Sequence, residues 1–314
     1  MSPLVGRPDG VRAFAPATVA NLGPGFDILG LALAGPGDLV LARAAREPGV
    51  RIVSIEGDGG ALPLEAARNT AGIAAARTLE RAGVALGVEL EIVKGLPIGS
   101  GLGSSAASAA AAAYAVNVLV GSPLRKAELV GPCVEAEAAV AGRHADNVAP
   151  ALLGGLILVR SLDPLDLIRV LVPHGLAVAV ITPRHVVDTR AARAALPAEV
   201  PLAKLVRSTA QVAALMSACF SGDLALLARC MEEDVVTPAR ARLIPGCEDV
   251  IAAALAAGAL GSSISGSGPS IFALCHSERI AGAAARAMGE AFARAGLEST
   301  SFISPADNPG AREA

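Results

Sequence analysis

A glycine-rich segment, Leu96–Ala106, has the composition of a phosphate-binding loop. It lies between a strand-like run that ends at Val93 and an alanine-rich helix expected over Ser105–Val118. Glycines at such a junction let successive backbone N–H groups turn toward one point, and the helix N-terminus adds partial positive charge. Ser104 and Ser105 add two hydroxyls, one suited to capping the helix and the other to a magnesium ion. The simpler alternative is a plain turn with a serine cap.

The spacing within this segment separates it from two other phosphate loops. A Walker A loop requires a Gly-Lys pair, and the sequence contains none. Gly101–Ala106 does fit the GxGxxA pattern of dinucleotide-binding folds, but such a fold needs an acidic residue about 20 positions later, at the end of a strand. The next acid, Glu128, falls inside an expected helix, so the dinucleotide interpretation fails on context.

Two further segments combine glycines with polar residues. Ala15–Gly30 follows the first strand-like run and offers the amide of Asn21 and the carboxylate of Asp27. It fits either an Asx-rich turn or a loop that presents both groups to a small polar substrate. Gly261–Ser270 contains so many glycines and serines that ordering it as a plain linker would be costly. Close backbone approach, to a ligand or to the phosphate loop, explains that composition better.

The elements that must position these segments indicate an α+β protein, because strand-like and helical runs alternate without strict βαβ order. We expect a boundary near Ser161–Pro173, giving domains of residues 1–163 and 164–314, and a loosely held polar tail at Ser304–Ala314. The expected strands are Val11–Ala15, Leu39–Ala42, Val50–Ile55, Val88–Val93, Gly155–Val159, Ala177–Ile181 and Ser270–Leu274; the expected helices are Thr70–Ala82, Ser105–Val118, Lys126–Ala141, Thr189–Leu196, Ala203–Phe220, Leu224–Glu232, Glu248–Ala257 and Ile280–Ala295.

Composition excludes several classes of function. The 314 residues carry a formal net charge of −3 and only 2% aromatic residues, which argues against a nucleic-acid-binding protein. The longest apolar stretch, Ala106–Val120, is mostly alanine, so it predicts a packed helix rather than a membrane span. Met1–Ala13 lacks the apolar core of a secretory signal, and the five cysteines and four histidines show no metal-ligand or disulfide spacing. A reducing, cytoplasmic compartment is expected.

Together, the three glycine-rich segments resemble the signature motifs of the GHMP kinase superfamily and, within it, the branch that phosphorylates L-homoserine. The second likeness depends on His144–Pro150 with Gly154 and Gly155, on Arg193–Pro197 and on Arg240–Gly246. The resemblance implies ATP- and Mg²⁺-dependent transfer of a phosphoryl group to the side-chain hydroxyl of L-homoserine, a step of threonine biosynthesis. It also implies a two-domain fold, with an N-terminal ribosomal-protein-S5-like α/β domain that binds the nucleotide and a C-terminal ferredoxin-like α+β domain.

By position in these motifs, the resemblance implies roles for individual side chains. Asp146 and Arg240 are the expected catalytic residues, with Asp146 orienting the substrate hydroxyl first and accepting its proton second. Ser105 and Glu137 are the expected magnesium ligands, and Glu135 is the alternative to Glu137. The nucleotide is expected at Asn69, Lys94, Pro97, Ile98, Gly99, Ser100, Gly101, Leu102, Gly103, Ser104, Ser105 and Ser267, and the substrate at Asn21, Asp27, His144, Thr189, Arg193 and Arg240.

The chemistry of a zwitterionic substrate agrees with these positions. Arg193 and Arg240 can each grip a carboxylate with two hydrogen bonds, and Asp27 suits an ammonium group. Without the resemblance, each arginine would fit a surface role equally well, and His144 a structural one. Thr18 stands where some relatives have a lysine, which weakens a strong-base mechanism and favours alignment with charge neutralisation.

Two rival functions are weighed against this one. The first is another small-molecule kinase of the same superfamily, acting on mevalonate, galactose or a diphosphocytidyl substrate. The second is an inactive relative that only binds ligand, which loss of the phosphate loop, the glutamate or the aspartate would mark; all three are present. The expected partner is a small molecule, without nucleic acid or membrane, and a homodimer is kept as an alternative to a monomer.

Overall fold

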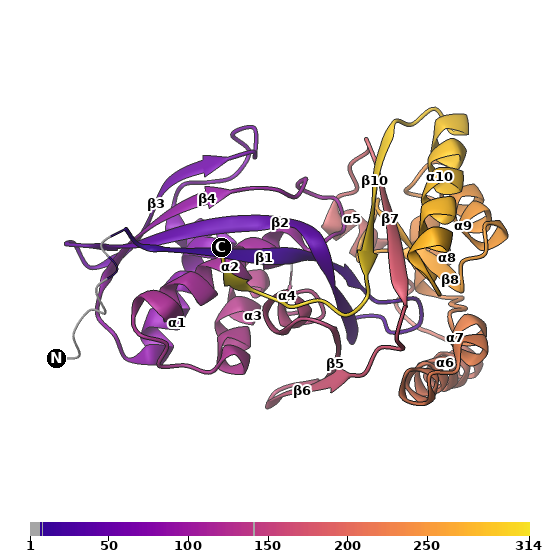
Figure 1. The fold of residues 1–314 in the computed structure, drawn as a ribbon, viewed down its shortest axis with the longest axis horizontal. Helices are drawn as coiled ribbons and strands as arrows, with labels where there is room; N and C mark the ends of the chain where they lie inside the picture. Colours follow the sequence, from indigo (N-terminus) through magenta and orange to yellow (C-terminus); the bar gives the residue numbers. More distant parts are fainter. Residues whose placement is uncertain (1–6, 8, 141) are drawn as a thin grey trace.

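The computed structural model describes residues 7, 9–140 and 142–314, and two sheets organise them (Figure 1). Residues 1–6 and 8, on which much of the expectation of no secretory signal rests, lie outside the described residues. Among those described, seven strands form the first sheet, in the order β11-β1-β2-β4-β3, with β5 paired to β2 and β6 to β5. The strands are β1 (Val11–Ala20), β2 (Leu29–Ala45), β3 (Gly49–Glu56), β4 (Gly87–Val93), β5 (Leu156–Leu162), β6 (Leu165–Val170) and β11 (Arg312–Glu313).

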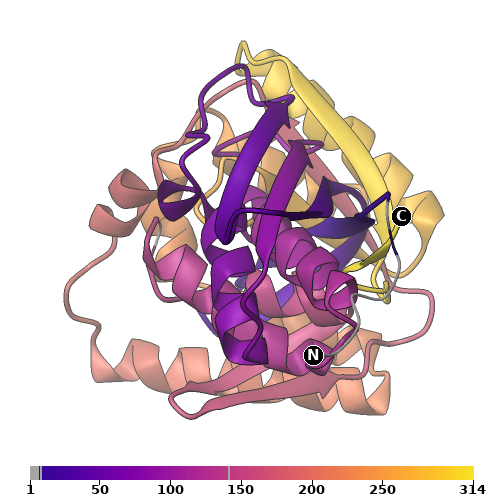
Figure 2. The same cartoon turned by 90° about the vertical axis from the view of Figure 1, so that its left-hand side faces the viewer.

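Helices cover one face of this sheet, as Figure 2 shows from the end of the molecule. They are α1 (Thr70–Ala82), α2 (Ser104–Leu119), α3 (Val130–Ala138) and α4 (Val148–Leu153), with short 3₁₀ turns η1 (Ala66–Arg68) and η2 (Lys126–Leu129). The alanines of α2 are buried all round, and their small side chains let the helix contact both β1 and β2. No helix in the described part of the chain is both long and apolar enough to cross a membrane.

The second sheet is antiparallel, in the order β10-β7-β9-β8. Alternate residues of β7 face different cores: Ala179 packs with α9 and α10, whereas Val178 and Val180 pack with α6, α7 and the ends of β1 and β2. The core that contains Val178 and Val180 joins the two halves of the molecule. The elements are β7 (Ala177–Pro183), β8 (Gly261–Ile264), β9 (Ile271–Cys275), β10 (Ser299–Pro305), α5 (Thr189–Ala194), α6 (Leu202–Ser221), α7 (Leu224–Cys230), α8 (Val236–Ala241), α9 (Cys247–Ala256) and α10 (Glu278–Arg294).

The passage between the sheets comes later than the boundary expected at residue 163. Asp163 and Pro164 form the turn between β5 and β6, which pair with each other in the first sheet. The chain leaves that sheet after Val170 and enters the second at Ala177. Pro164 therefore marks a hairpin turn, whereas Pro173, at the end of the expected boundary region, lies in the connection between the sheets.

The expectation of a loose C-terminal tail is wrong. Glu313 and Arg312 pair with Ala13 and Phe14 of β1, so the tail ends as the edge strand of the first sheet. Asn308 is buried and donates to the carbonyl oxygen of Ala32. Backbone pairing thus holds a segment whose polar composition alone suggested otherwise.

Several short elements were also absent from the sequence-based assignment. The helices α4 and α8 have six residues each, too few to show a helical repeat. The strands β6 and β10 carry exposed residues, and β8 lies within the glycine- and serine-rich third segment. The helix expected over Lys126–Ala141 is divided into η2 and α3, and its last residue lies outside the described residues.

Candidate active site

A cavity of about 580 Å³ opens where loops from both halves of the molecule meet. The phosphate loop and the N-terminus of α2 line it from the first half of the chain, and α5 and α8 line it from the second half. Most residues singled out from the sequence line it, including Asn21, Asp27, Asn69, Ile98, Gly99, Ser100, Gly101, Gly103, Ser104, Ser105, Glu137, His144, Asp146, Thr189, Arg193, Arg240 and Ser267.

The loop Pro97–Gly103 joins β4 to α2 and depends on its glycines. Gly101 and Gly103 have φ angles of +77° and +66°, a left-handed conformation that glycine adopts at little cost. A Cβ atom at Gly101 would stand 2.5 Å from the carbonyl oxygen of Ser265. The backbone is therefore packed too closely for any side chain at that position.

The third glycine-rich segment supports this loop, as one of the two sequence-based alternatives predicted. The hydroxyl of Ser265 donates to the carbonyl oxygen of Gly101 at 2.7 Å. The backbone N–H of Ser270 donates to the carbonyl oxygen of Ser100 at 3.1 Å. The expected close approach to the phosphate loop is confirmed.

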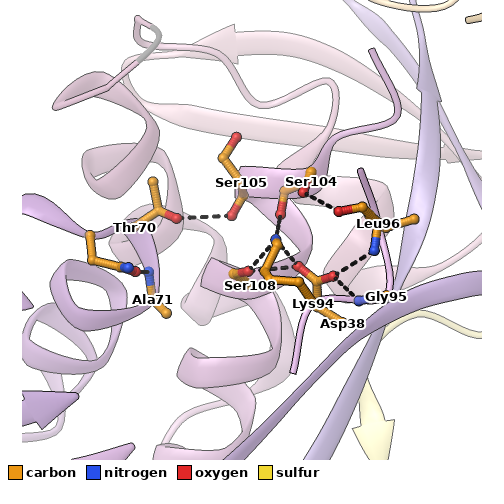
Figure 3. Close-up of polar contacts among 10 residues, drawn as sticks. Asp38, Thr70, Ala71, Lys94, Gly95, Leu96, Ser104, Ser105 and Ser108 are labelled. Atoms are coloured by element: carbon orange, nitrogen blue, oxygen red, sulfur yellow. Dashed lines mark hydrogen bonds and ion pairs between the residues drawn. The ribbon is translucent and has the colours of Figure 1, made fainter. Parts of the chain in front are cut away.

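The two serines at the start of α2 differ from the expected arrangement. The helix begins at Ser104 with Gly103 at the cap position, so neither serine serves as the cap. The Ser104 hydroxyl donates to the carbonyl oxygen of Leu96 at 3.3 Å, which closes the loop at its base (Figure 3). Ser105 lies one residue further on, half-buried at the cavity wall, and its carbonyl oxygen accepts from the hydroxyl of Thr70.

Two buried carboxyl groups also line the cavity. Glu137, at the end of α3, and Asp146, just before α4, each have one oxygen with no hydrogen-bond partner within residues 7, 9–140 and 142–314. Burial raises the pKa of Glu137 to about 7, against the opposing effects of Ser105 and Lys94. Burial, reinforced by the negative charge of Asp27, raises the pKa of Asp146 to about 7. Buried polar atoms without partners in a cavity point to groups that await a ligand.

Glu135 lies on a different face of α3 from Glu137. It is exposed and pairs with Arg77 of α1 at 3.0 Å, whereas Glu137 is 7% exposed and lines the cavity. Glu137 is therefore the carboxylate of α3 that can reach a bound cation.

The charged residues expected to bind a zwitterion pair with one another. Arg193 donates to both carboxylate oxygens of Asp27, at 2.8 and 3.2 Å, and its second terminal nitrogen lies 2.8 Å from Nε2 of His144. Burial lowers the pKa of His144, with Arg193 and Arg240 acting in the same direction and Asp27 opposing them. The neutral imidazole can accept a hydrogen bond from the guanidinium group.

Phe26 organises the two arginines and was not singled out from the sequence. Its ring centroid lies 5.1 Å from the guanidinium carbon of Arg193 and 5.2 Å from that of Arg240. Arg240 is buried and also donates to the carbonyl oxygen of Gly266 at 2.7 Å. The available signal was an aromatic residue beside Asp27, in a chain with only six phenylalanines.

Lys94 also lines the cavity, and its ammonium group is engaged within the protein. An ammonium group has three hydrogen-bond donors, and those of Lys94 reach Asp38, the Ser108 hydroxyl at 2.7 Å and the Ser104 carbonyl oxygen at 2.9 Å (Figure 3). All three donors have partners within the protein, and the expected contact of Lys94 with the nucleotide stays a prediction. Asn69 is also engaged: it accepts from the N–H of Ala71, as the N-cap of α1, and donates to a carbonyl oxygen.

The first glycine-rich segment is shorter as a loop than expected, because β1 continues to Ala20 and β2 begins at Leu29. Asn21 accepts from the N–H of Asp27 at 3.1 Å and donates to the carbonyl oxygen of Gly266 at 3.2 Å, so its amide holds the loop in shape. Asn21 and Asp27 have φ angles of +72° and +61°, strained for residues other than glycine and typical of functional loops. Asn147 accepts from the Thr18 hydroxyl at 2.7 Å, a contact the sequence did not suggest.

Comparison with known proteins places the chain among kinases of small molecules. Residues 69–155 match the family model of the GHMP kinases N terminal domain, and residues 215–294 match that of the GHMP kinases C terminal domain. The chain is 46% identical to a homoserine kinase of Arabidopsis thaliana, over 96% of this chain and 84% of the relative. It is 45% identical to a homoserine kinase of Chlorobium phaeovibrioides, over 96% and 98% of the two chains. The crystal structure of a homoserine kinase from Cytophaga hutchinsonii is 44% identical and superposes with a TM-score of 0.96, each chain being covered completely.

Proposed function

Because the chain belongs to the GHMP kinase family, on its homoserine kinase branch, we propose that it transfers the γ-phosphoryl group of ATP to the side-chain hydroxyl of L-homoserine. The products are ADP and O-phospho-L-homoserine. One observation carries this proposal: a single cavity joins a glycine-rich phosphate loop to a cluster of two guanidinium groups and a carboxylate. A phosphate donor and a zwitterionic acceptor can therefore occupy it together.

The triphosphate lies against the loop Pro97–Gly103, where backbone N–H groups and the N-terminus of α2 attract anionic oxygens. Ser105 and Glu137 would hold Mg²⁺, because its usual protein ligands are one or two oxygens and Glu137 has an unpartnered oxygen among the described residues. The ion, when bound, neutralises charge on the phosphate oxygens. Transfer through a loose transition state requires mainly this neutralisation and correct alignment.

Arg193 and Arg240 bind the substrate carboxylate, and Asp27 binds its ammonium group. Arg240 approaches from α8 and Arg193 from α5, while Asp27 belongs to the loop between β1 and β2. Phe26 lies between them and keeps both guanidinium groups against one aromatic ring. The pocket thereby selects an amino acid by its two charges before any contact is made with its hydroxyl.

Asp146 orients the substrate hydroxyl and accepts its proton. As the hydroxyl oxygen bonds to the γ-phosphorus, the bond from that phosphorus to the ADP oxygen breaks, and the hydroxyl proton passes to Asp146 and then to solvent. Only the ionised carboxylate can accept this proton, and a pKa of about 7 gives it that form at neutral to basic pH.

The experiment that tests the proposal incubates purified protein with ATP, Mg²⁺ and L-homoserine and identifies the product by mass spectrometry. Parallel reactions replace homoserine with mevalonate or galactose. We expect a product heavier than homoserine by one phosphoryl group, and none from the other two alcohols. Phosphorylation of mevalonate or galactose in preference to homoserine would assign the chain to a different small-molecule kinase, and binding without turnover would indicate an inactive relative.

We also propose a reducing, cytoplasmic setting, because all five cysteines, each within the described residues, are buried free thiols. A homodimer is proposed as well, and analytical ultracentrifugation decides between it and a monomer.

A further inference from the structure

A buried ion pair lies directly beneath the phosphate loop. Asp38, in β2, is fully buried, and the side chain of Lys94, just after β4, is 2% exposed. The pair is joined by the hydroxyl of Ser108 in α2, which accepts from Lys94 at 2.7 Å and donates to Asp38 at 2.6 Å. Figure 3 shows the three side chains meeting, with bonds from the pair to Gly95 and Leu96 and to Ser104.

Stability alone does not account for such a pair. Removing two charges from water is costly, and apolar residues of similar size commonly serve a protein core as well or better. The pair is fully hydrogen-bonded and lies between β2, β4 and α2, where Lys94 and Ser108 reach the wall of the cavity beside Ile92. We therefore expect a role of the pair in holding the backbone around it in a defined geometry.

The bonds of the pair reach both ends of the loop. One oxygen of Asp38 accepts from the backbone N–H groups of Gly95 at 3.0 Å and Leu96 at 3.3 Å, where the chain leaves β4. Lys94 donates to the carbonyl oxygen of Ser104 at 2.9 Å, where the chain enters α2. The residues between these two anchors, 97–103, are the phosphate loop itself.

We propose that Asp38 and Lys94 are positioning residues for the triphosphate: their ion pair fixes the separation between the two ends of the loop Pro97–Gly103 and thereby sets its affinity for phosphates. In this proposal Asp38 acts through the backbone of the loop, and Lys94, which lines the cavity, acts through its bonds to Asp38, Ser108 and the Ser104 carbonyl oxygen. The proposal rests on the proposed function, because it concerns ATP bound at this loop. Loss of the ion pair should therefore weaken binding of ATP but not of adenosine, because adenosine has no phosphates to contact the loop.

The test measures binding of ATP with Mg²⁺, and separately of adenosine, by calorimetry. The variant is the double substitution Asp38→Asn with Lys94→Met, because removing both charges avoids an unpaired buried ion. The asparagine keeps an acceptor for the loop's first N–H groups, and the methionine removes the anchor to Ser104. We expect the Kd for ATP to rise by about tenfold or more, the scale on which supporting contacts tune a site, with the Kd for adenosine unchanged.

A matched control uses a second ion pair between the same two strands. Arg43 and Glu91 pair on the exposed side of β2 and β4, so Arg43→Met with Glu91→Gln should leave both affinities unchanged. Failure of the unmodified protein to bind ATP would refute the proposed function. A folded double variant that binds ATP normally, or that loses ATP and adenosine equally, would overturn the positioning role instead.

Ser108→Ala provides a second, milder variant if the double variant does not fold. It removes the hydroxyl that links the two charged groups and leaves the charges paired. We expect weaker binding of ATP alone, by a smaller factor than in the double variant. Equal affinities of this variant and the unmodified protein for ATP would also overturn the proposal.

Discussion

The buried carboxyl group of Asp146 predicts that its ionisation lowers the free energy of unfolding at neutral to basic pH. Asp146 is 3% exposed, and one of its oxygens has no partner in the part of the chain that the structure describes. Burial and the neighbouring charge of Asp27 raise its pKa from the ordinary 3.8 to about 7. Replacing it with asparagine keeps the shape of the side chain and removes the charge.

The sign and size of the effect follow from the pKa. A group whose pKa is higher in the folded state stabilises the fold below its unfolded pKa, and this stability is lost as pH rises to the folded value. The rise from 3.8 to about 7 corresponds to about 4 kcal/mol at pH 8. Because part of this cost is already present at pH 5, the Asp146→Asn variant should gain about 2–3 kcal/mol more, relative to the unmodified protein, at pH 8 than at pH 5.

Urea denaturation of both proteins at pH 5 and pH 8 measures this difference, and kcat is measured on the same samples. The variant should unfold at higher urea at pH 8 and have a kcat lower by about 100-fold or more, because asparagine cannot accept the hydroxyl proton. Asp166→Asn is the control, since the side chain of Asp166 is exposed, pairs with Arg160 and does not line the cavity. A variant less stable than the unmodified protein at pH 8, or a stability difference equal at both pH values, would refute the reasoning.

Four further predictions test individual contacts. Ser105→Ala should raise the Mg²⁺ concentration for half-maximal turnover by about tenfold or more, and an unchanged Mg²⁺ dependence would contradict its role as a ligand. Glu137→Gln should abolish turnover while Glu135→Gln retains it, and the reverse result would place the metal on the other face of α3. Arg193→Ala should raise the KM for homoserine by about tenfold to a hundredfold and leave the KM for ATP unchanged. Arg193→Lys should restore the KM for homoserine only in part, and full restoration would argue against a bidentate contact with the carboxylate. Phe26→Leu should raise the KM for homoserine by about tenfold, because it removes two cation–π contacts. Phe26→Tyr keeps an aromatic ring and should leave this KM unchanged. Equal KM values for the two variants would show that the aromatic ring does not determine the affinity for homoserine.

Local patterns predicted the parts of the fold that local forces determine. The helix Thr70–Ala82 was predicted to the residue, because its apolar spacing and its end before Gly83 are both encoded in adjacent residues. The phosphate loop was recognised for the same reason: its glycines act on their own backbone. The short strand Arg312–Glu313 could not be predicted, since its stability comes from β1, almost 300 positions earlier.

The same distinction holds for the site. Composition and motif suggested which residues belong to the site; all of them except Pro97 and Leu102 line the cavity, and their binding roles stay predictions. The contacts among these side chains join residues far apart in the sequence and could not be derived from spacing. The ion pair between Lys94 and Asp38 is an example. Asp38 itself gave no signal, because a single aspartate in a strand-like run is ordinary until its partner is known.

The contact between Asp27 and Arg193 explains how the proposed site can discriminate between alcohols. Each of the two groups carries the charge that a zwitterion needs, and both remain about a third exposed to solvent. An ion pair of this kind contributes little stability, about 1 kcal/mol or less, so breaking it is cheap. In the proposed site, homoserine would replace the pair with two new ones, carboxylate to Arg193 and ammonium to Asp27. An alcohol with one charge would leave the other group unpaired, and a neutral alcohol would gain neither contact. Under this proposal the internal pair competes with the substrate, and only a zwitterion displaces it without leaving a charge unpaired, so the exchange of ion-pair partners contributes to selection among hydroxyl compounds.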